Sequence, residues 1–174
     1  MTSACRFSLF RLHRRSSVRG FTLVEIGMAT LIIGVLAALG VPSLKRTLIA
    51  TRASAVASDL RTFAGTFQHY EQQNGSFPPA AGIGVMPPVL QGALSQSAWE
   101  RVTPIGGRYS WESNSLEAGV RYRAGISIRS LLPSRVTADR ELLLALDRLI
   151  DDGNLATGNF FLGAGNEPYL VIER

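Results

Sequence analysis

Few side chains in this sequence have the chemistry of a ligand or a catalyst. The one oxygen-rich cluster is Asp151-Asp152-Gly153-Asn154, and carboxylate and amide oxygens of this kind suit calcium. Calcium needs about six or more oxygens, so the same residues can also be interpreted as a helix end followed by a turn. The two histidines, His13 and His69, have no second ligand or base at a recognisable spacing. The sequence therefore predicts no enzyme activity, and calcium at Asp151, Asp152 and Asn154 is its one candidate cofactor.

Glu25 is a carboxylate at the head of a long apolar segment. Residues 26–44 read IGMATLIIGVLAALGVPSL and contain no charge, and Lys45 and Arg46 end the segment. As a helix this segment would be roughly 28 Å long, close to the hydrocarbon thickness of a bilayer. A carboxylate at membrane depth costs several kcal/mol unless it is paired or protonated, whereas at the interface water solvates it. We expect a membrane span in which Glu25 either has a functional partner or lies at the interface.

Positive charge is concentrated before this segment. Five of the 18 basic residues lie in residues 1–20, which contain no acidic residue. Residues 21–174 therefore contain 13 basic and 13 acidic residues and have a net charge of zero. The net charge of the remainder gives no argument for a nucleic-acid partner. The arginine excess predicts a cytoplasmic N-terminus and a body across the membrane. Cys5 is the single cysteine, which excludes a disulfide or a thiolate metal site in residues 21–174.

The N-terminal residues also form a specific pattern. Residues 19–25, Arg-Gly-Phe-Thr-Leu-Val-Glu, followed by the apolar run with Pro42, resemble the signal of type IV pilins and type II secretion pseudopilins. In that family a peptidase on the cytoplasmic face cuts after the glycine and methylates the new N-terminal residue. The resemblance implies cleavage between Gly20 and Phe21, N-methylation of Phe21, and a role for Glu25, the fifth mature residue, in assembly.

The resemblance has further implications for conformation, partners and location. Pro42 falls where the family often has a proline that perturbs the helix, so we expect a kink there. The expected partners are copies of itself and other pilin-like subunits, the prepilin peptidase, an inner-membrane assembly platform and, before assembly, membrane lipid. The protein would be a single-pass inner-membrane protein with a periplasmic C-terminal domain, and then part of an envelope filament. Major pseudopilins bind calcium in a C-terminal loop, which bears on Asp151, Asp152 and Asn154.

A helical pattern continues beyond the apolar segment. Apolar side chains recur at helical spacing on one face between residues 45 and 74, at Ile49, Val56, Leu60, Phe63, Phe67 and Tyr70. Asn74-Gly75 and Pro78-Pro79 predict the end of the helix. A coiled coil and a helix packed on the protein's own sheet are both compatible with the stripe, and we prefer the sheet because globular domains routinely bury such faces.

The remaining sequence predicts a connecting loop and a small sheet. Residues 75–107 are rich in Gly and Pro, with at most a short helix near 90–100. Alternating residues predict strands at 108–112 and 120–129, joined by a turn over 113–119, and a final hairpin around 163–168. A helix is expected over 137–151 with Thr137 as N-cap. The predicted fold class is α+β, with a long N-terminal helix on an antiparallel sheet and a further C-terminal helix over residues 108–174.

Three functions are compatible with these features. The first is a structural subunit of a type II secretion pseudopilus or type IV pilus-like filament, made with a leader at 1–20 and polymerised through residues 21–44. The second is a minor pilin for adhesion or DNA uptake, in which Arg121, Arg123 and Arg129 contact phosphates, although such a strand face is more often simply solvated. The third is a single-span membrane protein that does not assemble.

Overall fold

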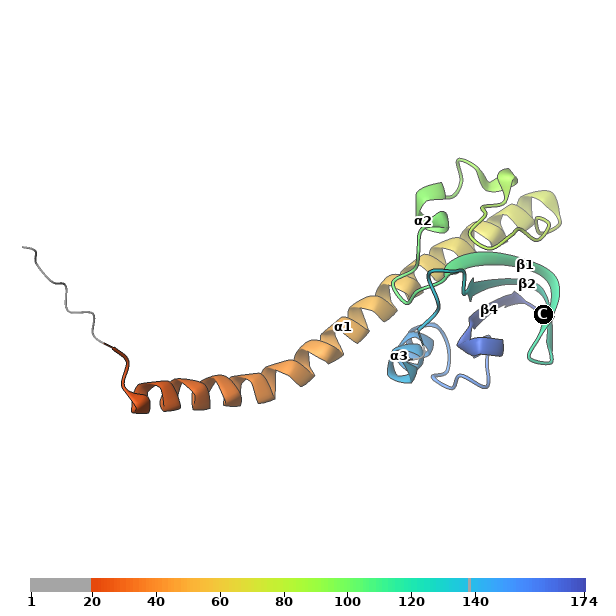
Figure 1. Cartoon of the computed structure of the whole chain (residues 1–174). Helices are drawn as coiled ribbons and strands as arrows, with labels where there is room; N and C mark the ends of the chain where they lie inside the picture. The colour runs from red at the N-terminus through yellow and green to blue at the C-terminus, as the bar shows by residue number, and fades with distance from the viewer. Residues whose placement is uncertain (1–19, 138) are drawn as a thin grey trace, which may run out of the picture. The chain divides into compact units, whose positions relative to one another are not determined.

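The computed structural model describes residues 20–137 and 139–174, so the predictions on the leader arginines, His13 and Cys5 lie outside the described residues. The chain divides into two units, with the boundary between Val41 and Pro42. Its helices and strands, labelled in Figure 1, are α1 Leu23–Asn74, α2 Gln96–Glu100, β1 Arg108–Glu117, β2 Val120–Arg129, α3 Arg140–Ile150, β3 Phe160–Leu162 and β4 Pro168–Glu173, with 3₁₀ turns at Pro88–Leu90 and Ala164–Asn166.

The described part of the N-terminal unit is the beginning of α1. Every residue from Gly20 to Val41 is exposed, including large apolar side chains such as Leu36, and no part of the apolar window is buried. By length and composition, α1 is the one helix among the described residues that could cross a membrane. Apolar surface of this extent is stable only when lipid or another apolar surface covers it.

The C-terminal unit is built from the second half of α1 and a four-stranded antiparallel sheet. The strand order is β1-β2-β4-β3, so β4 lies between the first hairpin and β3. The predicted apolar stripe of α1 faces this sheet, because Val56, Leu60, Phe63 and Phe67 are at most 2% exposed and belong to the main core. The predicted α+β fold, with the stripe packed on the protein's own sheet, is confirmed (Figure 1).

Aromatic side chains form the centre of this core. Phe67 of α1 stacks on Trp111 of β1 with ring centroids 3.6 Å apart and planes 5° from parallel. Phe63 meets Tyr109 edge to face at 4.9 Å, and Trp99 of α2 is tilted against both Phe63 and Phe67. These contacts hold α1, α2 and β1 together through apolar area and favourable ring geometry.

The connecting segment 75–107 is attached to this core by side-chain hydrogen bonds. The indole N–H groups of Trp111 and Trp99 donate to the carbonyl oxygens of Pro78 and Val85, at 2.9 and 3.0 Å. The carboxylate of Asp59 on α1 accepts a hydrogen bond from the Tyr109 hydroxyl at 2.8 Å, and it forms an ion pair with Arg101. Burial, together with the charge of Asp59, raises the pKa of Tyr109 far above its usual range, so its hydroxyl remains a donor. The segment therefore has fixed contacts on α1 and β1 despite its Gly- and Pro-rich sequence.

The first hairpin is longer than the sequence predicts. Strand β1 continues to Glu117, and Ala118 and Gly119 form a two-residue turn with φ of 48° and 81°. Positive φ at both central positions is typical of a type I′ turn, whose twist matches that of the flanking strands. Alanine rarely adopts such a φ, which explains why the sequence predicts a seven-residue turn here instead.

The apolar side chains of β2 do not share a single face. A register shift between Ala124 and Gly125 interrupts the pairing with β4. Residues Ala124, Ile126 and Ile128 belong to the main core, whereas Tyr122 packs in a second cluster with Phe161, Tyr169 and Val171. Simple alternation along β2 would group Tyr122 with Ala124, Ile126 and Ile128, so it does not predict this division.

Helix α3 begins at Arg140, three residues later than the sequence predicts. Its N-cap is Asp139, whose carboxylate accepts hydrogen bonds from the backbone N–H groups of Glu141 and Leu142. Thr137 is therefore not the N-cap, and its hydroxyl instead accepts a hydrogen bond from the Asp139 backbone N–H. An Asp carboxylate is at least as good a cap as a threonine hydroxyl, so the later residue takes the position.

Candidate functional site

Gly20, Phe21 and Glu25 lie together at the start of α1. Glu25 and Thr22 form a reciprocal cap, in which the Thr22 backbone N–H donates to Glu25 Oε2 at 3.0 Å and the Glu25 backbone N–H donates to Thr22 Oγ1 at 3.1 Å. The Thr22 hydroxyl also donates to the same carboxylate oxygen at 3.0 Å. This is a capping box, which satisfies backbone donors that the first turn of a helix otherwise leaves unpaired.

The cap leaves the predicted scissile bond outside the helix. Helix α1 begins at Leu23, so Gly20 and Phe21 precede it, and Phe21 is 81% exposed. A bond that is not in regular structure and not covered by side chains is accessible to a peptidase. Thr22 is not among the predicted site residues, although its Thr-x-x-Glu spacing is the signal of a capping box.

Pro42 lies inside α1, at the first residue of the C-terminal unit. The helix continues on both sides of it, and the kink expected there stays a prediction. Shortly after it, Lys45 forms an ion pair with Glu141 of α3 at 2.9 Å, with both side chains well exposed. Exposed pairs of this kind contribute little to stability because water and salt screen them, so packing rather than this ion pair holds α3 beside α1.

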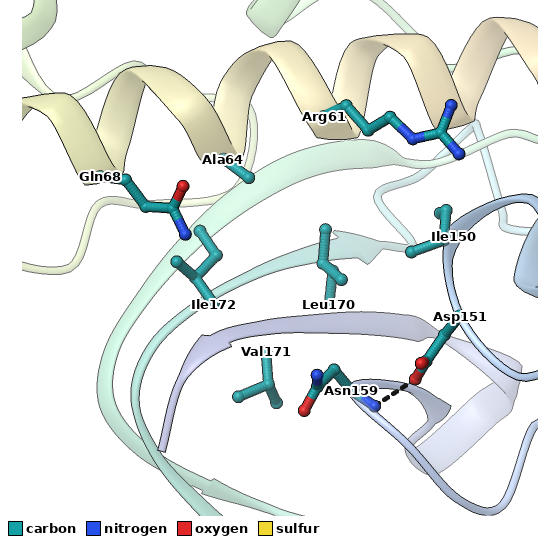
Figure 2. A pocket seen from close by; sticks show the side chains of 9 residues that line it. All are labelled: Arg61, Ala64, Gln68, Ile150, Asp151, Asn159, Leu170, Val171 and Ile172. Atoms are coloured by element: carbon teal, nitrogen blue, oxygen red, sulfur yellow. Dashed lines mark hydrogen bonds between the residues drawn. The ribbon is translucent and has the colours of Figure 1, made fainter.

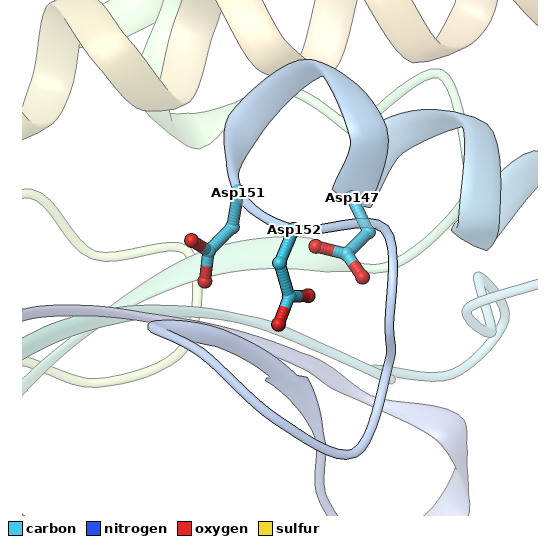
Figure 3. A group of neighbouring side chains, drawn as sticks. All are labelled: Asp147, Asp151 and Asp152. Carbon is cyan, nitrogen blue, oxygen red and sulfur yellow. The ribbon is translucent and has the colours of Figure 1, made fainter.

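The second candidate site is the acidic cluster at the end of α3, shown in Figure 3. Asp151 and Asp152 come together as the sequence predicts, and they are joined by Asp147 of the last turn of α3. One carboxylate oxygen of each lies within 4.8 Å of those of the other two. The side-chain oxygen of Asn154, the third residue of the sequence prediction, accepts a hydrogen bond from the Ala156 backbone N–H at 3.3 Å.

Asp147 is the ligand candidate that sequence reasoning missed. It is completely buried beside Leu142, Leu143 and Leu146, and neither of its carboxylate oxygens has a hydrogen-bond partner. Burial, with a further contribution from the charge of Asp152, raises its pKa to about 6. A detectable signal was its spacing, four residues after Leu143, which places an acid on the buried face of the helix.

Beside this cluster, a groove of about 280 Å³ runs between α1 and β4. Figure 2 shows that Arg61 and Gln68 border it from α1, with Leu170 and Ile172 on β4. Asp151 reaches its edge, where its carboxylate accepts a hydrogen bond from the Asn159 backbone N–H. Among the described residues that line the groove there is no nucleophile and no pair of carboxylates.

The arginines of β2 are largely engaged within the domain. Arg129 pairs with Glu112 and Glu167, each at 3.3 Å, and Arg123 pairs with Glu173. Arg121 is exposed. His69 is also engaged, since its Nε2 lies 2.9 Å from the side-chain amide of Gln73 on the same helix. The unpaired positive charge that this strand offers to a phosphate backbone is therefore smaller than its sequence suggests.

Comparison with known proteins finds similarity among solved structures. No protein-family model and no curated protein matches the sequence. Among solved structures, the major type IV pilin PilA1 from Clostridium difficile is similar, with a TM-score of 0.53 and 17% identity over 74% of this chain and 98% of that chain. At this identity the similarity concerns architecture alone. The long N-terminal helix, the four-stranded antiparallel sheet and the further helix of this chain make up the α+β fold of a type IV pilin.

Proposed function

We propose that this protein is a structural subunit of a pilin-like filament of the bacterial envelope. The observation that carries the proposal is the combination of a pilin-like fold with a helical segment, residues 26–44, that is exposed, apolar and without charge. Such a segment suits a bilayer before assembly and suits equivalent segments of neighbouring subunits afterwards. Two environments of equal apolarity allow the subunit to move from one to the other at modest cost.

The proposed mechanism begins with removal of residues 1–20. A prepilin peptidase cuts the Gly20–Phe21 bond and methylates the new amine of Phe21, and an assembly platform in the inner membrane extracts the subunit. Glu25 then pairs with the Phe21 amine of a neighbouring subunit, which gives this carboxylate a charged partner in an apolar environment. The capping box supports this role, because Thr22 already holds the carboxylate beside the residue whose amine is released.

Within this class we favour a pseudopilus of type II secretion. Many type IV pilins carry a C-terminal disulfide, and residues 21–174 of this chain contain no cysteine. The minor-pilin alternative, with DNA bound at Arg121 and Arg123, is favoured less because Arg123 is paired with Glu173. A DNA shift assay with Arg121→Ala and Arg123→Ala distinguishes the two, since a pseudopilus subunit shows no DNA-dependent shift that these substitutions reduce.

The first experiment is intact-mass analysis and N-terminal sequencing of the protein from its native host, with and without the prepilin peptidase. We expect a chain that starts at Phe21 and carries one added methyl group only when the peptidase is present. A chain that retains residues 1–20 in both strains would contradict the proposal and favour a membrane-anchored domain that does not assemble.

A second experiment addresses assembly separately from processing. Glu25→Gln keeps the size of the side chain but removes its charge, so we expect normal cleavage and a loss of filaments of at least tenfold. Glu71→Gln, at the other end of α1, is the matched control and should assemble like the wild type. Filaments are measured by shearing and immunoblotting, and unchanged filament yield in Glu25→Gln would contradict the role of Glu25.

A further inference from the structure

Positive charge follows the apolar segment of α1 without any acid to balance it. Residues 26–44 carry no charge, and Lys45, Arg46 and Arg52 are the only charged residues from 45 to 58. All three are exposed. Because no acidic residue lies on this stretch of α1, its positive charge is not balanced along the helix. A surface of this kind attracts a partner that carries negative charge.

Helix α3 adds a further basic residue to this surface. Lys45 Nζ lies 2.9 Å from Glu141 Oε2, which places the first turn of α3 beside this part of α1. Arg140, the first residue of α3, is exposed. We define the basic collar as Lys45, Arg46, Arg52 and Arg140. All four residues belong to the C-terminal unit.

Three of the four charges in the basic collar have no counter-charge within the described protein. Among residues 20–137 and 139–174, Arg46, Arg52 and Arg140 take part in no ion pair. The carboxylate of Asp139, which directly precedes Arg140, is engaged in capping α3. These guanidinium groups therefore remain available to an external anion, and a guanidinium can bind two phosphate oxygens with parallel hydrogen bonds.

The basic collar begins where the apolar segment ends. At 1.5 Å per residue, Arg46 lies about 3 Å beyond Leu44 along the helix axis, and Arg52 lies about 12 Å beyond it. The headgroup region of a bilayer extends roughly 5–8 Å beyond the hydrocarbon on each side. The Cα–Cβ bonds of a helix tilt toward its N-terminus, so the long side chain of Arg52 is directed back toward the apolar segment. Both arginines can therefore reach headgroup phosphates when residues 26–44 cross a bilayer.

We propose that the basic collar binds the headgroups of anionic phospholipids at the surface of the membrane that residues 26–44 cross. A lipid surface is the partner because the collar adjoins the end of the one described helix that could cross a membrane. Each basic residue near an anionic surface strengthens such binding about fivefold. The inference rests on the membrane span that the proposed function also requires, but it does not rest on filament assembly.

The test is photo-crosslinking of the full chain in vesicles that contain equal amounts of phosphatidylglycerol and phosphatidylcholine. The crosslinker is introduced as Leu48→benzoylphenylalanine, at a position between Arg46 and Arg52 that is 49% exposed. Mass spectrometry then distinguishes adducts with either lipid from adducts with a second copy of the protein. We expect phosphatidylglycerol adducts to exceed phosphatidylcholine adducts at least about fivefold at low salt. This preference should largely disappear in about 1 M sodium chloride, where the Debye length is about 3 Å.

Matched charge substitutions test whether the basic collar causes the preference. Arg46→Gln combined with Arg52→Gln removes two of its charges, and we expect the ratio of the two lipid adducts at residue 48 to fall below about two. Arg121→Gln combined with Arg148→Gln removes the same charge from β2 and from the last turn of α3. These two arginines are also exposed, so this control should leave the ratio unchanged.

A second crosslinker position separates this proposal from the membrane span itself. Leu36→benzoylphenylalanine lies in the middle of the apolar segment and should form adducts with both lipids in similar amounts, because their acyl chains are alike. Lipid adducts at residue 36 without a preference at residue 48 would overturn the proposal on the basic collar and leave the proposed function standing. No lipid adducts at residue 36 would contradict the membrane span, and with it both proposals.

Two further results would count against the basic collar. A preference for phosphatidylglycerol that persists in the variant with Arg46→Gln and Arg52→Gln would show that the collar is not its source. Adducts at residue 48 that join two copies of the protein, in place of protein and lipid, would mean that the collar is a contact between subunits.

Discussion

Gly106 precedes β1 in a turn that passes very close to another part of the backbone. Its φ is 82°, and a methyl group on its Cα would lie 2.0 Å from the carbonyl oxygen of Arg135. Both the backbone conformation and the space at this position therefore require glycine. Gly65 differs in both respects, because it lies inside α1 and a methyl group there would meet nothing within 4 Å.

These two glycines provide a matched pair of substitutions. We expect Gly106→Ala to lower the free energy of unfolding by about 2 kcal/mol or more, through left-handed strain and the clash with Arg135. Gly65→Ala should instead raise it by about 0.5–1 kcal/mol, because alanine is the better helix former. Urea denaturation of both variants checks the signs, and equal effects would contradict the close approach at Gly106.

At this scale the sequence is informative where a residue belongs to a local pattern. The Thr-x-x-Glu spacing indicates the hydrogen bonds between Thr22 and Glu25 that the structure contains. The carboxylates of the adjacent Asp151 and Asp152 also lie close together in the fold. Asp147 could not be assigned in the same way. Its significance comes from burial and from the absence of a partner, and both depend on how α3 packs against the core.

The second half of α1 is held to the sheet mainly by aromatic packing. Phe67 is 0% exposed and stacked on Trp111, so its ring contacts both the sheet and α2. Thr66, the preceding residue, is exposed, and its hydroxyl donates only to the Thr62 carbonyl oxygen of the same helix. One turn of α1 thus presents a core contact and a solvent-facing residue at neighbouring positions.

Replacing these neighbours should have very different effects. Phe67→Ala removes a buried ring and leaves a cavity, so we expect a loss of about 3–5 kcal/mol in the free energy of unfolding and a change in the near-ultraviolet circular dichroism of Trp111. Thr66→Ala should change stability by less than about 0.5 kcal/mol. A small effect of Phe67→Ala would mean that α1 does not depend on this stack.

Periodicity predicts the elements of this fold better than their arrangement. The stripe on α1 follows from a spacing of 3.6 residues and the first two strands from a spacing of 2, whereas β3 and β4 follow from short apolar runs, and all of these elements form. The placement of β4 between β2 and β3 follows instead from long-range pairing, as in the register of Ile126 with Leu170. The turn at Ala118 and Gly119 has alanine where Asn, Asp or Gly usually precedes the second glycine, so the usual hairpin signal is absent.

For the whole molecule, the decisive feature is the separation of α1 into two parts with different surroundings. Its first part belongs to a unit in which all residues from Gly20 to Val41 are exposed, and its second part belongs to a folded domain. Because none of residues 20–41 is buried, burial gives this first part no contribution to the stability of the folded domain. Its function should therefore be separable from folding by substitution.

A charge in the middle of the apolar segment tests this separation. Leu36→Arg should make membrane insertion less favourable by about 3 kcal/mol and reduce the fraction of protein that resists alkaline extraction from membranes. Leu48→Arg places the same charge beyond Lys45 and Arg46, at a position that is also exposed, and should leave that fraction unchanged. Equal extraction of the two variants would argue against residues 26–44 as the membrane span.

The way in which residues 75–107 are attached has a consequence for the biogenesis of the protein. Two indole hydrogen bonds and the ion pair between Asp59 and Arg101 hold this segment, and residues 21–174 contain no cysteine that could form a covalent link. Folding of the domain formed by residues 42–174 therefore requires no thiol oxidase or disulfide isomerase, and its rate should be the same under reducing and oxidising conditions. If the proposed function holds, the protein can mature in cells whose envelope lacks an oxidative folding pathway.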